Sequence, residues 1–253
     1  MNVRHWLSAL ALAGAAGLCS SASAQVTGTI KLDGKAPEMP VIDMSGVPQC
    51  ATQHAGQTVT EQTVVVGKDG GLANVVVSIV PAEGTTLPEV KHPEAVLDQK
   101  GCMYDPHVIA MVKGEKLFIQ NSDGFLHNVH SQSETDPFNF AQPMTGKKAA
   151  PKPKEAEYFH VKCDVHPWMS AWIAVLDNGY FGVTDDTGKF TIPAGLPDGD
   201  YKVHAWHEKY DAQDGTVTVK DGKGTVDFTF KDAGADAGPQ ETPAKPVKVA
   251  SAK

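Results

Sequence analysis

One short stretch decides how this chain is interpreted: Cys163-Asp164-Val165-His166-Pro167-Trp168-Met169. It places a thiolate, an imidazole and a thioether between two apolar, alternating segments, which predicts a tight turn that joins two strands. A further imidazole, His127, lies upstream and is followed by Asn128. Two His, one Cys and a weak axial Met form the donor set of copper electron-transfer sites, because sulfur ligands favour Cu(I) and imidazoles also suit Cu(II). The stretch therefore predicts a copper site.

A packed core and a zinc site are the two alternatives for these residues. A free Cys and a Met are often simply buried in a core. One Cys and two His can also bind zinc, although a thioether and the lack of a further thiolate or hard ligand argue against it. His130 is an odd number of residues from His127, so on a strand it faces the opposite side. The combination of donors favours copper over both alternatives.

The composition describes an acidic globular chain. It has 253 residues, 41% of them hydrophobic, a formal net charge of -8 and a single arginine, Arg4. Proteins that bind nucleic acid through phosphates need a basic surface, so that class is excluded. The sequence lacks a G-x-S-x-G nucleophile motif and the H-x-H pattern of further copper ligands, so we expect no enzyme.

The hydrophobic pattern predicts an all-β fold. Alternating β-branched stretches recur at short intervals between Gly-rich and Asp-Gly turns, which is typical of antiparallel sandwiches. The expected strands before residue 178 are 26–32, 58–66, 74–80, 107–113, 116–120, 158–163 and 171–177. Those after it are 180–184, 189–193, 200–206, 216–220 and 225–231. Residues 131–155 lack such a pattern and are expected to form a long surface loop.

Four segments are expected along the chain. Residues 1–24 have the positive start, apolar run and small-residue end of a signal peptide cleaved after Ala24. Residues 25–177 form one sandwich, and residues 178–232 a second, smaller one. Residues 233–253 are rich in Ala, Gly, Pro and Lys and are expected to be disordered. No later segment is long enough to span a membrane, so a periplasmic or secreted protein is expected.

The ligand stretch and the pair His127-Asn128 resemble the cupredoxin family, and the short loop is similar to the amicyanin type of these plastocyanin-like blue copper proteins. The resemblance implies a Greek-key sandwich with one type 1 copper ion. The ligands that it implies are His127, Cys163, His166 and Met169. It also implies a hydrogen bond from the backbone N–H of Asn128 to the Cys163 sulfur, and a stiff loop at Pro167. Asp164 departs from the family, which has a neutral residue there, and its orientation stays open.

The resemblance further implies a function. His166 and Trp168 would be the electron port, through which single electrons pass to a redox partner such as a c-type cytochrome or a periplasmic oxidoreductase. The acidic chain favours a basic patch on that partner, with an association that salt weakens. Two alternatives remain, a periplasmic copper carrier or storage protein and a metal-free structural or ligand-binding sandwich.

The segment after residue 178 carries a second resemblance. Residues 182–190 and 196–201 are similar to carboxypeptidase-regulatory or transthyretin-like modules. The shared features are mostly turn residues, so they imply a β-sandwich and no activity.

The cysteine count adds one expectation. Removal of the signal peptide leaves Cys50, Cys102 and Cys163, an odd number in an oxidising compartment. With Cys163 assigned to copper by the resemblance, Cys50 and Cys102 remain as a pair and are expected to form a disulfide. The alternative is an additional metal or thiol site, supported by the nearby His107.

Overall fold

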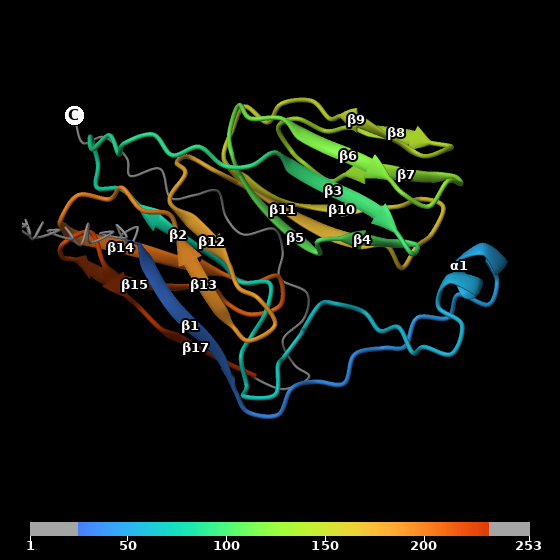
Figure 1. Cartoon of the computed structure of the whole chain (residues 1–253), viewed down its shortest axis with the longest axis horizontal. Coiled ribbons are helices and arrows are strands. Elements are labelled where there is room, and N and C mark those ends of the chain that lie inside the picture. Colours follow the sequence, from blue (N-terminus) through green and yellow to red (C-terminus); the bar gives the residue numbers. More distant parts are fainter. Residues whose placement is uncertain (1–24, 233–253) are drawn as a thin grey trace, which may run out of the picture.

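The computed structural model describes residues 25–232. The expected signal peptide (1–24) and the expected disordered tail (233–253) lie outside the described residues. Within them the chain is almost entirely β and forms two sandwiches that lie side by side, which confirms the all-β prediction (Figure 1). Over the same residues, no helix has the length and apolarity needed to cross a membrane.

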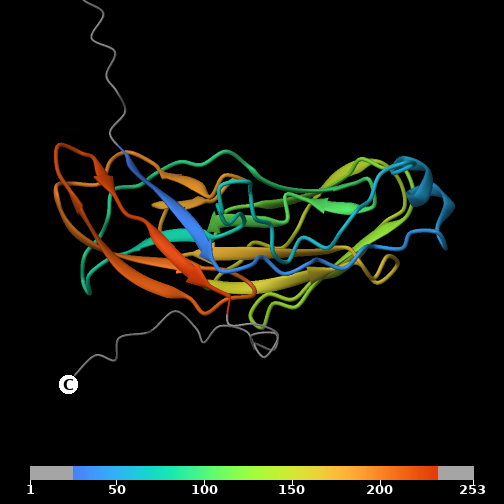
Figure 2. The same ribbon diagram turned by 90° about the horizontal axis from the view of Figure 1, so that it is seen from below.

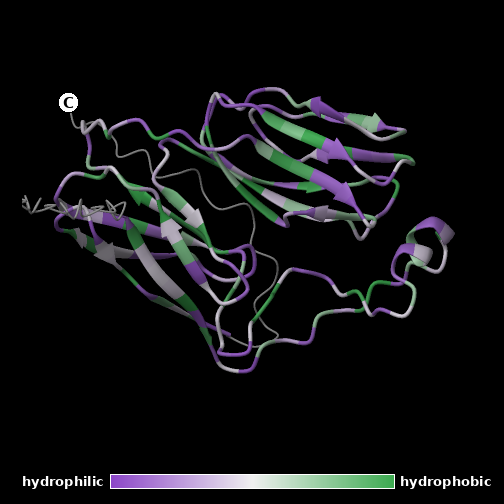
Figure 3. Cartoon of the chain, viewed as in Figure 1, coloured by the Kyte–Doolittle hydropathy of each residue, from purple (hydrophilic) through white to green (hydrophobic). Residues whose placement is uncertain are grey.

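The first sandwich contains two mixed sheets. One has the order β5-β11-β10-β7-β8 and the other the order β4-β3-β6-β9. Their strands are β3 (Ala95–Lys100), β4 (Met103–Asp105), β5 (Val108–Val112), β6 (Leu117–Asn121), β7 (His127–Ser131), β8 (Asn139–Gln142), β9 (Gly146–Ala149), β10 (Glu157–Lys162) and β11 (Ser170–Leu176). The alternating apolar residues of these strands face inward and form one buried core, which Figure 3 shows as hydrophobic stretches along β3 and β6.

The second sandwich combines both ends of the described chain. One sheet has β1 at its centre, between β13 on one side and β16 and β17 on the other, and the second sheet has the order β12-β2-β14-β15. Its strands are β1 (Val26–Asp33), β2 (Val76–Val80), β12 (Phe181–Val183), β13 (Lys189–Ile192), β14 (Gly199–Trp206), β15 (Gln213–Val219), β16 (Gly224–Thr225) and β17 (Phe228–Lys231).

The expected division at residue 177 does not separate the two sandwiches. β1 pairs with β13, and β2 pairs with β12 and β14, so the earliest strands belong to the module expected from residue 178 onward. One buried core joins Ile30 and Val77 with Tyr180 and Phe230. The alternation of apolar residues identifies a strand but not its partner. For this reason β1 and β2 were expected in the first sandwich, although they belong to the second.

Residues 34–71, here called the crossing segment, leave the second sandwich after β1, pack against the first sandwich and return to the second. After β1 the chain runs along the first sandwich, forms α1 (Pro48–Gln53) at its far end and returns toward β2 (Figure 2). The strand expected over 58–66 is wrong, because this part makes only isolated bridges, between Val41 and Thr60 and between Val66 and Leu72. The loop expected over 131–155 is also wrong in part, since it contains β8 and β9.

A buried polar contact joins the sandwiches where their apolar surfaces meet. The Glu208 carboxylate contacts Nε2 of His107 and accepts a hydrogen bond of 2.9 Å from the indole N–H of Trp172. Trp206 packs next to this contact, with its ring centroid 5.3 Å from that of Trp172. Apolar side chains from β2, β11, β12 and β14 surround these groups. The two sandwiches are therefore packed as one unit.

Candidate metal centre

Three of the four predicted donors converge at one end of the first sandwich. His127 begins β7, while Cys163 and His166 lie in the turn between β10 and β11. The Nδ1 atoms of His127 and His166 are 2.9 Å apart, and the Cys163 sulfur is 3.7 Å from Nδ1 of His166. All three donor atoms lie within 4.8 Å of one another, and all three residues are buried.

This arrangement fits a small metal ion. Metal–sulfur and metal–nitrogen bonds are about 2.3 and 2.0 Å long. When the angle between the two bonds at the metal is about 120°, the sulfur and the nitrogen are about 3.7 Å apart. The observed sulfur–nitrogen distance matches that value. Thiolate and imidazole are donors that together suit copper in both oxidation states. The chemistry of the donor set therefore agrees with its geometry.

The turn that carries these donors is closed by its own backbone. The N–H of Met169 donates to the carbonyl of His166 (3.0 Å), and the N–H of Cys163 donates to the carbonyl of Met169 (3.3 Å). Met169 is fully buried and packs in the same core as Cys163. Pro167 is exposed at the outside of the turn. The turn thus holds Met169, the remaining predicted donor, against the core of the sandwich.

The hydrogen bond expected at the Cys163 sulfur has a different donor. The structure shows the backbone N–H of His166 donating to that sulfur at 3.4 Å, in place of the N–H of Asn128. The side-chain oxygen of Asn128 instead accepts a hydrogen bond from the backbone N–H of Asp164 (2.5 Å). Asn128 therefore fixes the start of the ligand turn rather than the sulfur itself.

The carboxylate of Asp164 is directed to the surface beside the turn. It contacts Nδ1 of His130 at 3.0 Å and accepts hydrogen bonds of 3.1 Å from the amides of Asn128 and Asn139. These bonds, that of His130 first, lower the pKa of Asp164 to about 2. His130 faces away from the buried donors, as its odd separation from His127 predicts. The Asp164 carboxylate, whose orientation could not be predicted from the sequence, thus points toward His130.

One buried group of the site, Asp123, was not predicted from the sequence. Its side chain is only 2% exposed, and Oδ2 lies 2.8 Å from Nε2 of His127. The same carboxylate accepts hydrogen bonds from the backbone N–H groups of Gly101 (2.7 Å) and Cys102 (2.8 Å). Its position shortly before His127 was the available signal, but spacing alone does not show that a loop carboxylate turns inward.

The disulfide between Cys50 and Cys102 is present, as predicted. It anchors the crossing segment over the end of the first sandwich that carries the predicted donors, where Met44 and partly buried apolar residues, Ile42 and Val47 among them, surround it. The bridge is close to the donors, because the two sulfurs and a ring nitrogen of His166 lie within 4.8 Å of one another. The crossing segment therefore forms one wall of the candidate centre.

This wall limits the surface exposure of His166 and Trp168, the two residues expected to form the electron port. His166 is only 2% exposed, so its ring has no free edge at the surface. Trp168 is half-buried, and its indole N–H donates to the carbonyl of Cys102 at 2.9 Å. The resemblance that implied an exposed port concerns a single sandwich. No local sequence pattern indicates that the distant crossing segment packs on the turn between β10 and β11.

The two imidazoles are kept in the neutral form that binds metals. Burial lowers the pKa of His127, although Asp123 acts in the opposite direction. Burial also lowers the pKa of His166, and the neighbouring His127 adds to the effect. When His127 donates its Nε2 proton to Asp123, its Nδ1 lone pair is left free to face the Cys163 turn. Both rings can therefore act as ligands at neutral pH.

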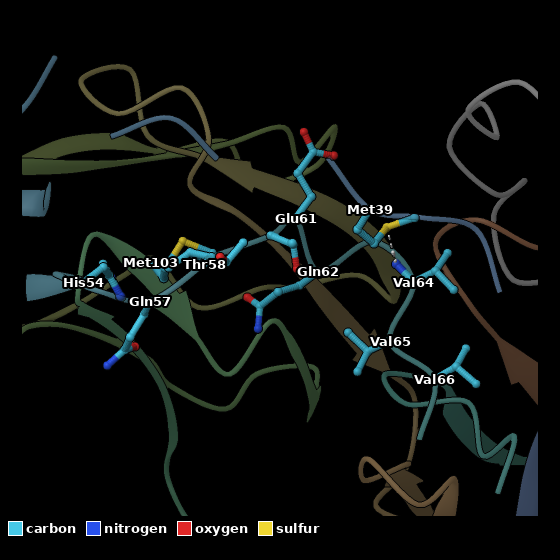
Figure 4. Close-up of a pocket in the computed structure, with 12 residues that line it drawn as sticks. Met39, His54, Gln57, Thr58, Glu61, Gln62, Val64, Val65, Val66 and Met103 are labelled. Carbon is cyan, nitrogen blue, oxygen red and sulfur yellow. Dashed lines mark hydrogen bonds between the residues drawn. The ribbon is translucent and has the colours of Figure 1, made fainter. Parts of the chain in front are cut away.

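A separate pocket of about 480 Å³ lies between the crossing segment and β4 (Figure 4). Its lining includes His54, Thr58 and Gln62 from the crossing segment and Met103 from β4. His54 is held by a contact of 2.6 Å between Nε2 and the carbonyl of Gly101. The pocket therefore adjoins the disulfide region without including the predicted donors.

Comparisons with known proteins give a limited result. No protein-family model matches the chain, and no curated protein matches it. Among solved structures it is similar to amicyanin from Paracoccus versutus, with 18% identity over 40% of this chain and 97% of that one and a TM-score of 0.30. It is also similar to a purple cupredoxin from Nitrosopumilus maritimus, with 18% identity over 33% of this chain and 100% of that one (TM-score 0.29).

A third similarity is to a copper-containing nitrite reductase from Thermus scotoductus, with 15% identity and a TM-score of 0.31. The match covers 39% of this chain and 25% of the reductase, so the chain spans about a quarter of that protein's length.

Proposed function

We propose that the first sandwich binds one copper ion through His127, Cys163, His166 and Met169 and transfers single electrons between redox partners. The observation that carries this proposal is the convergence of two imidazole nitrogens and one thiol sulfur within 4.8 Å of one another in a buried site. A bound copper ion supplies the one-electron Cu(II)/Cu(I) couple.

The protein's own groups support this role by keeping the donors in place. Asp123 orients the His127 ring, and the N–H of His166 donates to the Cys163 sulfur, where a hydrogen bond tunes the reduction potential. The closed turn and the disulfide-anchored wall limit movement of the donors. Donors that are held rigidly move little when the copper ion gains or loses an electron, which favours fast electron transfer.

The surface beside the donors offers a place for a partner. Leu126 is 44% exposed and Val165 is 43% exposed, and each directly precedes a donor histidine. Exposed apolar residues of this kind suit the small, transient interfaces of redox proteins. With a net charge of -8, the chain suits a partner with a basic patch, such as a c-type cytochrome or another periplasmic oxidoreductase.

The visible spectrum of the Cu(II)-loaded protein, before and after ascorbate, tests the site. We expect an intense thiolate-to-copper charge-transfer band that disappears on reduction and returns on oxidation. Cys163→Ser removes the thiolate and should abolish the band, whereas Ser170→Ala, at the start of β11, should retain it. A colourless protein with one tightly bound copper would favour a carrier or storage role, and a protein without copper would leave a metal-free sandwich.

Electron transfer itself needs a kinetic test. Leu126→Lys and Val165→Lys should slow the reaction with a cytochrome in stopped-flow experiments and leave the spectrum unchanged. The rate with a basic partner should fall as salt increases, because salt screens the attraction between the surfaces. If the electron-transfer rate changes neither with the substitutions nor with the ionic strength, the proposed partner surface is wrong.

A further inference from the structure

The buried disulfide is itself part of a group of metal-binding atoms. The sulfurs of Cys50 and Cys102 and a ring nitrogen of His166 lie within 4.8 Å of one another. The Cys102 sulfur is also within 4.8 Å of the Asp123 carboxylate and a ring nitrogen of His127. Both cysteines are completely buried. A bridge that only cross-links the chain does not require two imidazoles and a carboxylate as neighbours, so its surroundings point to a further role.

We propose that reduction of this disulfide creates a second metal site, in which the thiolates of Cys50 and Cys102 and the imidazole of His166 bind Cu(I). A protein dithiol would supply two electrons and two protons, so the S–S bond breaks, two thiols form and the dithiol becomes a disulfide. Cu(I) then replaces the thiol protons, which are released to solvent. Two thiolates and an imidazole are soft donors that suit this ion.

The backbone holds both sulfurs in position independently of the S–S bond. Cys102 is fixed by its N–H bond to Asp123 and by the bond from the Trp168 indole to its carbonyl. Cys50 lies on α1, and it packs together with Ala51 of that helix and with Met44 and Val47, which precede the helix, in the same small core. The two Cα atoms are 5.6 Å apart. Small side-chain rotations can therefore place the thiolates about 4 Å apart, as bonds of about 2.3 Å to one metal ion require.

The surroundings of the two cysteines also favour a soft, weakly hydrated ion. Partly buried apolar residues, Ile42, Val59 and Phe125 among them, enclose the bridge and exclude water. Because His166 belongs to both sets of donors, copper at this outer site lies next to the proposed electron-transfer site. The outer site does not need Cys163, so it can be tested in a protein that lacks the inner thiolate.

The test uses the full chain carrying Cys163→Ser, titrated anaerobically with Cu(I) against a coloured Cu(I) chelator. With the disulfide intact we expect no tight binding, and after reduction we expect one equivalent of Cu(I). Adding Cys102→Ser should remove that equivalent. Adding His166→Gln should weaken binding at least tenfold, while His130→Gln, a nearby histidine on the other face, should not.

A second measurement does not depend on the His166 variant. One equivalent of Cu(I) should protect both thiols of the reduced Cys163→Ser protein from alkylation by iodoacetamide. Full alkylation in the presence of Cu(I), or binding that does not change in the His166→Gln variant, would overturn the proposal. A different result, the absence of a charge-transfer band in the oxidised wild-type protein, would contradict the proposed electron-transfer site.

Discussion

The Asp123 carboxylate lies 2.8 Å from Nε2 of His127, inside the protein and beside the disulfide. The same group accepts hydrogen bonds from the N–H groups of Gly101 and Cys102. One buried carboxylate thus positions a proposed copper ligand and the loop that carries half of the disulfide. This pairing connects the end of the first sandwich that carries the predicted donors with the wall formed by the crossing segment.

Replacing Asp123 by Asn should weaken the metal site. The amide has one acceptor oxygen, and its NH₂ group would face an N–H donor, so at least one buried hydrogen bond is lost. We expect a loss of Cu(II) affinity of about 10–100-fold in a competition titration and a free energy of unfolding lower by about 1–3 kcal/mol. Asp177→Asn removes an exposed carboxylate of the same sandwich and serves as the control. Unchanged Cu(II) affinity would show that Asp123 does not orient His127.

The role of Met169 can be separated from its packing. Met169→Leu keeps a buried apolar side chain of similar volume and removes the thioether, so stability should change by less than about 1.5 kcal/mol. If the Met169 thioether is a copper ligand, its loss should raise the reduction potential of the copper-loaded protein and alter its visible spectrum. Met111→Leu, at another buried Met of the same core, should change neither property. If the wild type, Met169→Leu and Met111→Leu have the same spectrum and reduction potential, Met169 has only a packing role.

Acid should destabilise the second sandwich through His207. Burial first, and the charge of His107 second, lower the pKa of His207 from 6.5 to about 3. Between these values the unfolded chain binds a proton that the folded chain does not, so the free energy of unfolding decreases as the pH falls below about 6.5. The loss approaches its limit near pH 3 and is on the order of 3–5 kcal/mol.

Urea titrations at a series of pH values check this expectation. His207→Asn should be less stable at pH 8 but should show a flatter decrease toward acid. His204→Asn removes a more exposed imidazole beside Asp214 and should keep the acid sensitivity of the wild type. If the wild type and His207→Asn lose stability in parallel as the pH falls, His207 is not the responsible group.

The contact between the sandwiches should depend on Glu208. Glu208→Ala leaves the Trp172 indole N–H and Nε2 of His107 without their buried partner. We expect a loss of about 2–4 kcal/mol and two separate unfolding transitions in place of one. Calorimetry detects both effects, and Glu83→Ala at an exposed position is the control. A single transition at the wild-type temperature would show that apolar packing alone joins the sandwiches.

Much of the local structure could be predicted from the sequence. β1, β5, β10 and β11 lie within a residue or two of their expected positions, because alternation of apolar residues reports which face of a strand is buried. The short, polar strands β8 and β9 have no such pattern and were missed. α1 was missed as well, since six residues are too few for a helical period to show.

The sequence by itself determined the all-β class, the donor types and the disulfide partners. Each of these depends on residue identity, short spacing or the parity of the cysteines. Only the tertiary structure decided which strands pair, because alternation does not encode the partner of a strand. It also decided that Asp123 turns inward, that Asp164 faces His130 and that His166 is buried beside Cys50 of the crossing segment. These contacts join residues whose side chains meet only after both sandwiches have folded, so no local pattern could reveal them.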